Sequence, residues 1–221
     1  MPAPDRRPPR VAVVDDDTVI RLGMPLLLPP GVEDAGGFPD VDSLLAARPD
    51  ADVVLLDLVL SGTGVAAPVQ GAAGVRAVTA AGYRALIYTN ERRRLVLAGC
   101  LKAGARGVVH KAEGIDEVLR AIAAVHAGEI VITTALAGLA EVVERYGDLP
   151  ALTPRQRQVL SRRARGETFQ QIAGRLGVSR KTAEEHMADV SGKFVEYLRH
   201  HSAADLERHL GLSEGDLLSD T

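Results

Sequence analysis

The stretch Val11-Ala12-Val13-Val14-Asp15-Asp16-Asp17 decides the fold of this chain. Its unbroken apolar run predicts a strand buried on both faces, as in a parallel sheet. Three further runs also end on polar residues: Val53-Val54-Leu55-Leu56 before Asp57, Leu86-Ile87-Tyr88 before Thr89, and Val108-Val109-His110 before Lys111. Ligands of open parallel sheets bind beyond the carboxyl ends of the strands. We therefore expect these endings to converge on one site with three carboxylates, a hydroxyl and an ammonium.

Helical segments separate these runs, and glycine or proline marks their boundaries. They are predicted at residues 18–28, 42–48, 72–81, 92–103 and 115–127, with a weaker strand within residues 32–38. This alternation predicts an α/β domain with a doubly wound, five-stranded parallel sheet. The loop at residues 58–71 is long for such a connection and follows Asp57 directly, so we expect it to border the site.

The pattern changes after residue 150, where only short capped helices are predicted. Thr153 and Thr168 each open a capping box, and Ser179 caps a third helix that is predicted to end at about Val195. Gly177 provides the tight turn before that helix. Two short helices joined in this way form a helix-turn-helix, so a small all-α domain follows the α/β domain.

Composition narrows the class of protein. The chain has 221 residues, 46% of them hydrophobic, which suffices for two small cores. No apolar run reaches the roughly 18 residues of a membrane helix, so no membrane association is expected. The proline- and arginine-rich start lacks the apolar core of a secretory signal. A single cysteine, Cys100, predicts a buried inert thiol and is consistent with a cytoplasmic location.

The strand-end residues resemble the receiver domain of bacterial two-component response regulators, which has a flavodoxin-like fold. The stretch from Val11 to Asp17 matches the acidic-pair motif of that family, and Asp57 falls at its phosphoacceptor position. Thr89 and Lys111 fall on its switch hydroxyl and its phosphoryl-binding lysine. The resemblance implies that the phosphohistidine of a sensor histidine kinase phosphorylates Asp57.

Carboxylates clustered in this way suit magnesium (Mg²⁺), which prefers oxygen ligands and takes one or two carboxylates. We expect Asp15, Asp16 and Asp57 to bind the metal, and the resemblance adds the backbone carbonyl of Val59. Phosphoryl transfer needs mainly positioning and charge neutralisation, which Lys111 and Thr89 can provide. Asp17 is expected to cap the first helix instead.

The C-terminal segment resembles the LuxR/NarL-type helix-turn-helix. The match begins at Leu152-Thr153-Pro154-Arg155 and continues through Leu176-Gly177-Val178-Ser179, and residues 202–206 fit a fourth helix. Helical spacing places Ala183, Met187, Val190 and Phe194 on the packed side of the third helix. The expected contacts with double-stranded DNA are Arg180, Lys181, Thr182, Glu184, Glu185, His186 and Ala188. Between residues 151 and 199 there are ten lysines and arginines and five acidic residues. This local excess of about +5 favours contact with DNA phosphates.

Two other functions fit parts of the sequence. An atypical regulator could work without phosphorylation, through protein or ligand binding. A haloacid-dehalogenase-like phosphatase would use Asp15 as nucleophile and Asp17 as acid and base. It also needs an acidic pair on a strand after the lysine, where Glu113, Asp116 and Glu117 lie in a helical pattern.

The sequence therefore predicts a cytoplasmic, non-enzymatic transcriptional response regulator that binds DNA as a homodimer. Its expected parts are a disordered arm at residues 1–10, a receiver domain at 11–127, a linker with a helix at 128–150, the helix-turn-helix domain at 151–212, and a tail at 213–221.

Overall fold

The computed structural model describes residues 7–60, 69–145 and 149–201. Contacts divide the chain into two compact units, and each is described by itself. The first unit comprises Met1–Glu91 and Ala103–Val131, and the second Arg92–Lys102 and Ile132–Thr221. Helix α4 thus groups with the C-terminal helices. The domain limits drawn from the sequence stay a prediction.

The first unit contains a five-stranded parallel sheet in the order β2-β1-β3-β4-β5. Its strands are β1 (Arg10–Val14), β2 (Glu33–Phe38), β3 (Val53–Leu56), β4 (Arg84–Thr89) and β5 (Gly107–His110). The predicted doubly wound sheet is confirmed. The strand order reverses beside β1, and such a switch point is where open parallel sheets bind ligands.

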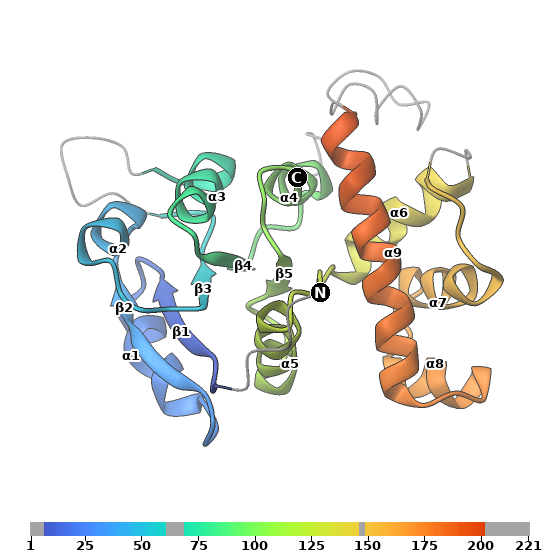
Figure 1. Ribbon diagram of the computed structural model, residues 1–221, viewed down its shortest axis with the longest axis horizontal. Helices are drawn as coiled ribbons and strands as arrows, with labels where there is room; N and C mark the ends of the chain where they lie inside the picture. Colours follow the sequence, from blue (N-terminus) through green and yellow to red (C-terminus); the bar gives the residue numbers. More distant parts are fainter. Residues whose placement is uncertain (1–6, 61–68, 146–148, 202–221) are drawn as a thin grey trace. The chain divides into compact units, whose positions relative to one another are not determined.

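Helices cover both faces of this sheet, with α1 and α5 on one side and α2 and α3 on the other (Figure 1). Their bounds are α1 (Thr18–Leu27), α2 (Val41–Ala47), α3 (Gly71–Ala80) and α5 (Ile115–His126). Val13, Leu55 and Val109 pack with Ile122 and Val125 of α5 in one core. The central strands are therefore buried on both faces, as their unbroken apolar runs predict.

The edge strand β2 explains why its sequence signal is weak. It pairs only with β1, and its residues are half-buried or exposed. Gly36 adopts a φ of 106°, which L side chains rarely reach. An edge strand containing such a residue needs no continuous apolar run.

The second unit is helical. It consists of α4 (Arg94–Lys102), α6 (Thr134–Arg145), α7 (Pro154–Ala164), α8 (Phe169–Leu176) and α9 (Arg180–His200). Helix α9 packs against α4, α7 and α8, and α6 packs against α7. Cys100 is buried in α4, as expected.

The capping signals place the helix-turn-helix as predicted. Thr153 and Gln156 form a reciprocal capping box at α7, and Thr168 and Gln171 form one at α8. Gly177 ends α8 with a left-handed φ of 64°. Each box satisfies two backbone donors at its helix start, one at the threonine and one at the glutamine, and so fixes where the helix begins.

Helix α9 is longer than predicted, because it continues past Val195 to His200. Phe194, Val195, Tyr197 and Leu198 are buried, so apolar packing extends the helix by more than one turn. The predicted fourth helix at residues 202–206 and the middle of the loop at 58–71 lie outside the described residues. In the described parts of the chain, no helix has the length and apolar character needed to span a membrane.

Candidate phosphoryl and metal site

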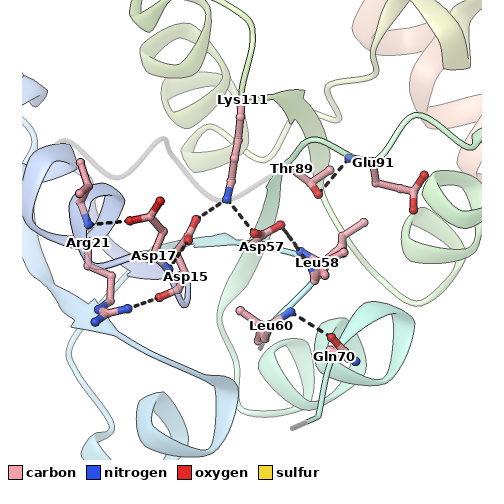
Figure 2. A network of polar contacts seen from close by, with 12 residues as sticks. Asp15, Asp17, Arg21, Asp57, Leu58, Leu60, Gln70, Thr89, Glu91 and Lys111 are labelled. Carbon is pink, nitrogen blue, oxygen red and sulfur yellow. Dashed lines mark hydrogen bonds and ion pairs between the residues drawn. The ribbon is translucent and has the colours of Figure 1, made fainter. Parts of the chain in front are cut away.

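The strand ends bring four of the predicted residues together at one edge of the sheet. Asp15 follows β1, Asp57 follows β3, Thr89 ends β4 and Lys111 follows β5 (Figure 2). Because these strands are parallel neighbours, their carboxyl ends lie on the same side of the sheet.

Lys111 bridges two carboxylates. Its Nζ atom lies 2.7 Å from Asp15 Oδ2 and 2.7 Å from Asp57 Oδ2. All three side chains are largely buried, so solvent screens these contacts weakly. Burial disfavours the charge on Lys111, but its hydrogen bonds to Asp15 and Asp57 outweigh this effect and raise its pKa. Lys111 is therefore a cation at neutral pH.

Asp57 is held by backbone donors. Its Oδ1 atom accepts hydrogen bonds from the amides of Leu58, at 2.7 Å, and Val59, at 3.4 Å. The side chain of Gln70 accepts from the Leu60 amide at 2.9 Å and ties the start of the loop to α3 (Figure 2). These contacts fix one carboxylate oxygen and leave Oδ2 toward Lys111.

Asp15 and Asp17 shape the turn between β1 and α1. Asp15 Oδ1 accepts from the Asp17 amide at 2.9 Å, and the Arg21 guanidinium donates to the Asp15 carbonyl at 2.7 Å. Asp17 Oδ1 accepts from the Val19 amide at 2.8 Å, which confirms the expected helix cap. Burial raises the pKa of Asp15 above its ordinary 3.8, although the hydrogen bond from Lys111 acts in the opposite direction.

Thr89 is buried beside this cluster. Its Oγ1 atom accepts from the Glu91 amide at 3.2 Å, and its carbonyl accepts from the Lys111 amide at 2.9 Å. The hydroxyl of Thr89 can still donate its own proton. Thr89 thus couples the ends of β4 and β5 to the segment that leads into α4.

The acidic cluster fits a divalent cation. Within the described residues, Asp15, Asp16 and Asp57 each offer a carboxylate oxygen, and these oxygens lie within 4.8 Å of one another. Three carboxylates against one ammonium leave a formal charge of about −2, which a divalent ion would balance. Donors that are all oxygen suit Mg²⁺ better than softer metals.

The predicted DNA-reading residues lie on the first turns of α9. Ala183, Met187, Val190 and Phe194 are buried, as expected from the helical spacing. Lys181 and Glu185 are exposed, and Thr182, Glu184, His186 and Ala188 are half-buried. Ser179 Oγ accepts from the Thr182 amide at 3.0 Å and fixes the start of the helix. The geometry therefore separates a packed side from an accessible side.

Both cations at the start of α9 are paired with glutamates of the same helix. Arg180 Nε lies 2.8 Å from Glu184 Oε1, and Lys181 Nζ lies 3.9 Å from Glu185 Oε1. The local charge of this accessible face is therefore close to zero.

Two structural contributors were not predicted from the sequence. Tyr88 places its ring centroid 5.9 Å from Lys111 Nζ, within cation–π range. Gln156 donates to Asp189 at 3.2 Å and accepts from Lys193 at 3.1 Å, which joins the start of α7 to α9. No pattern along the chain predicts these contacts, because each depends on which elements become neighbours.

Comparisons with known proteins agree with this arrangement. The family of bacterial regulatory proteins called the luxR family matches residues 150–204. The probable transcriptional regulatory protein SgaR of Hyphomicrobium methylovorum is 32% identical over 200 residues, covering 87% of this chain and 90% of that protein. The nitrate/nitrite response regulator NarP of Escherichia coli K12 is 31% identical over 202 residues, covering 86% and 90%.

A solved structure has the same fold. RcsB of Salmonella enterica serovar Typhimurium, bound to promoter P1flhDC with the phosphomimetic BeF3-, superposes with a TM-score of 0.54. The match covers 92% of this chain and 98% of that chain at 21% identity.

The sheet with its acidic strand ends, followed by the capped helix-turn-helix, defines a receiver-type regulator with a DNA-binding module. Relatives above 30% identity cover most of its length, and the chain belongs to the NarL/LuxR-type family of two-component response regulators. It is a DNA-binding transcriptional response regulator. The phosphatase interpretation finds no support, because every element after β5 in the described chain is a helix.

Proposed function

We propose that a sensor histidine kinase switches this regulator by phosphorylating Asp57. The observation that carries this proposal is the position of Asp57, whose Oδ2 atom lies 2.7 Å from Lys111 Nζ and which has a carboxylate oxygen within 4.8 Å of oxygens of Asp15 and Asp16. In the transfer, the P–N bond of a phosphohistidine breaks and a P–O bond to the Asp57 carboxylate forms. The histidine nitrogen keeps the bonding electron pair.

The residues around Asp57 have complementary roles in this proposal. The amides of Leu58 and Val59 hold Oδ1, so Oδ2, which these amides do not bind, is the proposed nucleophile. Lys111, already 2.7 Å from Oδ2, neutralises charge on the phosphoryl oxygens. Thr89 then donates its hydroxyl proton to one of these oxygens and shifts the Glu91 segment.

Asp15, Asp16, Asp57 and the carbonyl of Val59 would hold Mg²⁺. When bound, the ion supplies further neutralisation of the phosphoryl charge. The accessible side of α9 would enter the major groove, with Arg180, Lys181, Thr182, Glu184, Glu185, His186 and Ala188 as the contact residues. A homodimer would read two half-sites, and a cytoplasmic location would give the regulator access to both the kinase and the DNA.

Labelling with a small phosphoryl donor tests the site without the kinase. Acetyl phosphate with Mg²⁺ is expected to transfer one phosphoryl group to the full chain. Asp15→Asn is expected to lower the initial rate by about tenfold or more, because metal sites lose affinity steeply when a ligand is removed. Rates are read by intact-mass spectrometry. Equal rates for both proteins, or rates independent of Mg²⁺, would contradict the metal assignment.

An exposed apolar face on α1 is the proposed kinase contact. Leu22 and Leu26 are 69% and 85% exposed, and the helix follows directly from the Asp15–Asp17 turn. Exposed apolar patches of this kind mark interaction sites.

Leu22→Asp is therefore expected to slow transfer from a purified kinase that labels the wild-type chain by about tenfold or more. Labelling by acetyl phosphate is the internal control and should be unchanged. If both donors slow equally, the substitution has damaged the site itself. If neither slows, the kinase docks elsewhere.

A further inference from the structure

The start of α9, the proposed DNA-reading helix, carries two ion pairs. Arg180 and Lys181 are the cations on its first turn, and each faces a glutamate one turn later. The closer pair is Arg180 with Glu184, joined by a hydrogen bond of 2.8 Å. DNA phosphates must compete with Glu184 for the guanidinium.

This competition affects binding to any DNA sequence. Non-specific affinity comes mainly from cations that neutralise phosphates and release counterions. A guanidinium that is paired with a glutamate of its own helix contributes less to this non-specific affinity. The repulsion between Glu184 and the phosphate backbone lowers it further.

On one kind of base pair, however, a carboxylate is favourable. Glu184 can only accept hydrogen bonds when ionised, so it requires a base-edge donor. In the major groove, cytosine offers its N4 amino group, whereas adenine sets an acceptor, N7, beside its donor. Glu184 can therefore accept a hydrogen bond from cytosine without its carboxylate facing the N7 acceptor that adenine presents.

We propose that Glu184 determines specificity: it holds Arg180 away from phosphates on random DNA and accepts from a cytosine N4 amino group on target DNA. The proposal rests on the function proposed above, in which α9 reads the major groove. Glu184 is favoured over Glu185 because its pair with the cation is shorter, 2.8 Å against 3.9 Å. Once Glu184 engages the base, Arg180 becomes available to a phosphate.

Glu184→Gln separates the two roles of this side chain. Glutamine keeps the size but donates as well as accepts, and it pairs well with adenine. The matched control is Glu196→Gln, which removes the same charge from the same helix, where Glu196 pairs with Arg199 at 2.9 Å.

The experiment selects binding sites from a random double-stranded DNA library with the full-length proteins, followed by titration of selected and random duplexes over a range of salt concentrations. Wild type is expected to select a cytosine in each half-site, and Glu184→Gln to lose that preference by about 10- to 100-fold. On random DNA, Glu184→Gln is expected to bind more tightly, with the slope of log K against log salt steeper by about one per protomer. Glu196→Gln should behave as wild type.

The possible results distinguish the inference from the function beneath it. A wild-type protein that selects no sequence under any condition would contradict the use of α9 as a reading helix. A wild type that selects a motif which Glu184→Gln selects equally well would overturn the role of Glu184. Equal gains in random-DNA affinity for Glu184→Gln and Glu196→Gln would show that the gain comes from the change in net charge alone. That result would also overturn the role of Glu184.

Discussion

The Asp57→Asn protein is expected to take up no phosphoryl group from acetyl phosphate and Mg²⁺, whereas the wild type is labelled. An amide oxygen is a far weaker nucleophile than a carboxylate, so the P–O bond cannot form at this position. The substitution nearly preserves size, and Lys111 retains Asp15 at 2.7 Å. The protein should therefore fold, and its DNA affinity should be the same with and without the donor. Intact-mass spectrometry and a DNA-binding titration measure both quantities.

Asp17→Asn is the matched control for this experiment. Asp17 directly follows the pair Asp15 and Asp16, but its side chain caps α1, and asparagine caps helices equally well. This variant should be labelled at the wild-type rate. Persistent labelling of Asp57→Asn would place the phosphoacceptor elsewhere.

Lys111→Ala is expected to have the largest effect on stability. It leaves Asp15 and Asp57 buried and close together without their shared cation. Breaking a buried ion pair from one side typically costs about 3–5 kcal/mol of unfolding free energy. Urea denaturation at neutral pH measures the loss. A change below about 1 kcal/mol, the scale of exposed ion pairs, would show that the cluster is solvated.

The pH dependence of this loss has a definite sign. Burial already raises the pKa of Asp15 in the folded protein, and removing Lys111 takes away a contact that lowers it. For a carboxyl whose pKa is higher in the folded state, the contribution to stability is fully present below the pKa of the unfolded state, near 3.8. That contribution is lost as the pH rises through the pKa of the folded state. The defect of Lys111→Ala should therefore shrink as pH falls through that window. The double variant Asp15→Asn/Lys111→Ala should recover part of the loss at neutral pH.

The fold and the clustering of the strand-end residues could be predicted from the sequence because both depend on local patterns. Strands buried on two faces need unbroken apolar runs such as residues 53–56, and parallel strands place their ends at one edge. The runs ending at Asp15, Asp57, Thr89 and Lys111 therefore predicted both the parallel sheet and the meeting of these four residues. Capping boxes located α7 and α8 in the same local way.

The contacts within the site could not be predicted. Lys111 could have faced solvent, and only the packed sheet shows that it joins Asp15 to Asp57. Gln70 contacts Leu60 across ten residues of sequence. Helix α4 belongs to the same unit as α9, although β5, α5 and three further helices lie between them in the sequence. Helix α9 extends beyond its predicted end because Tyr197 and Leu198 are buried. This burial depends on neighbouring helices, which the local sequence does not show.

The central claim is that events at Asp57 control DNA binding. The most direct measurement is the affinity of the full chain for its selected DNA, with Mg²⁺ alone and with Mg²⁺ plus beryllofluoride, which mimics the phosphoryl group. We predict a change of about 5- to 150-fold, the usual range of coupling between two sites, and none for Asp57→Asn. An unchanged wild-type affinity, with beryllofluoride shown to be bound, would contradict the account.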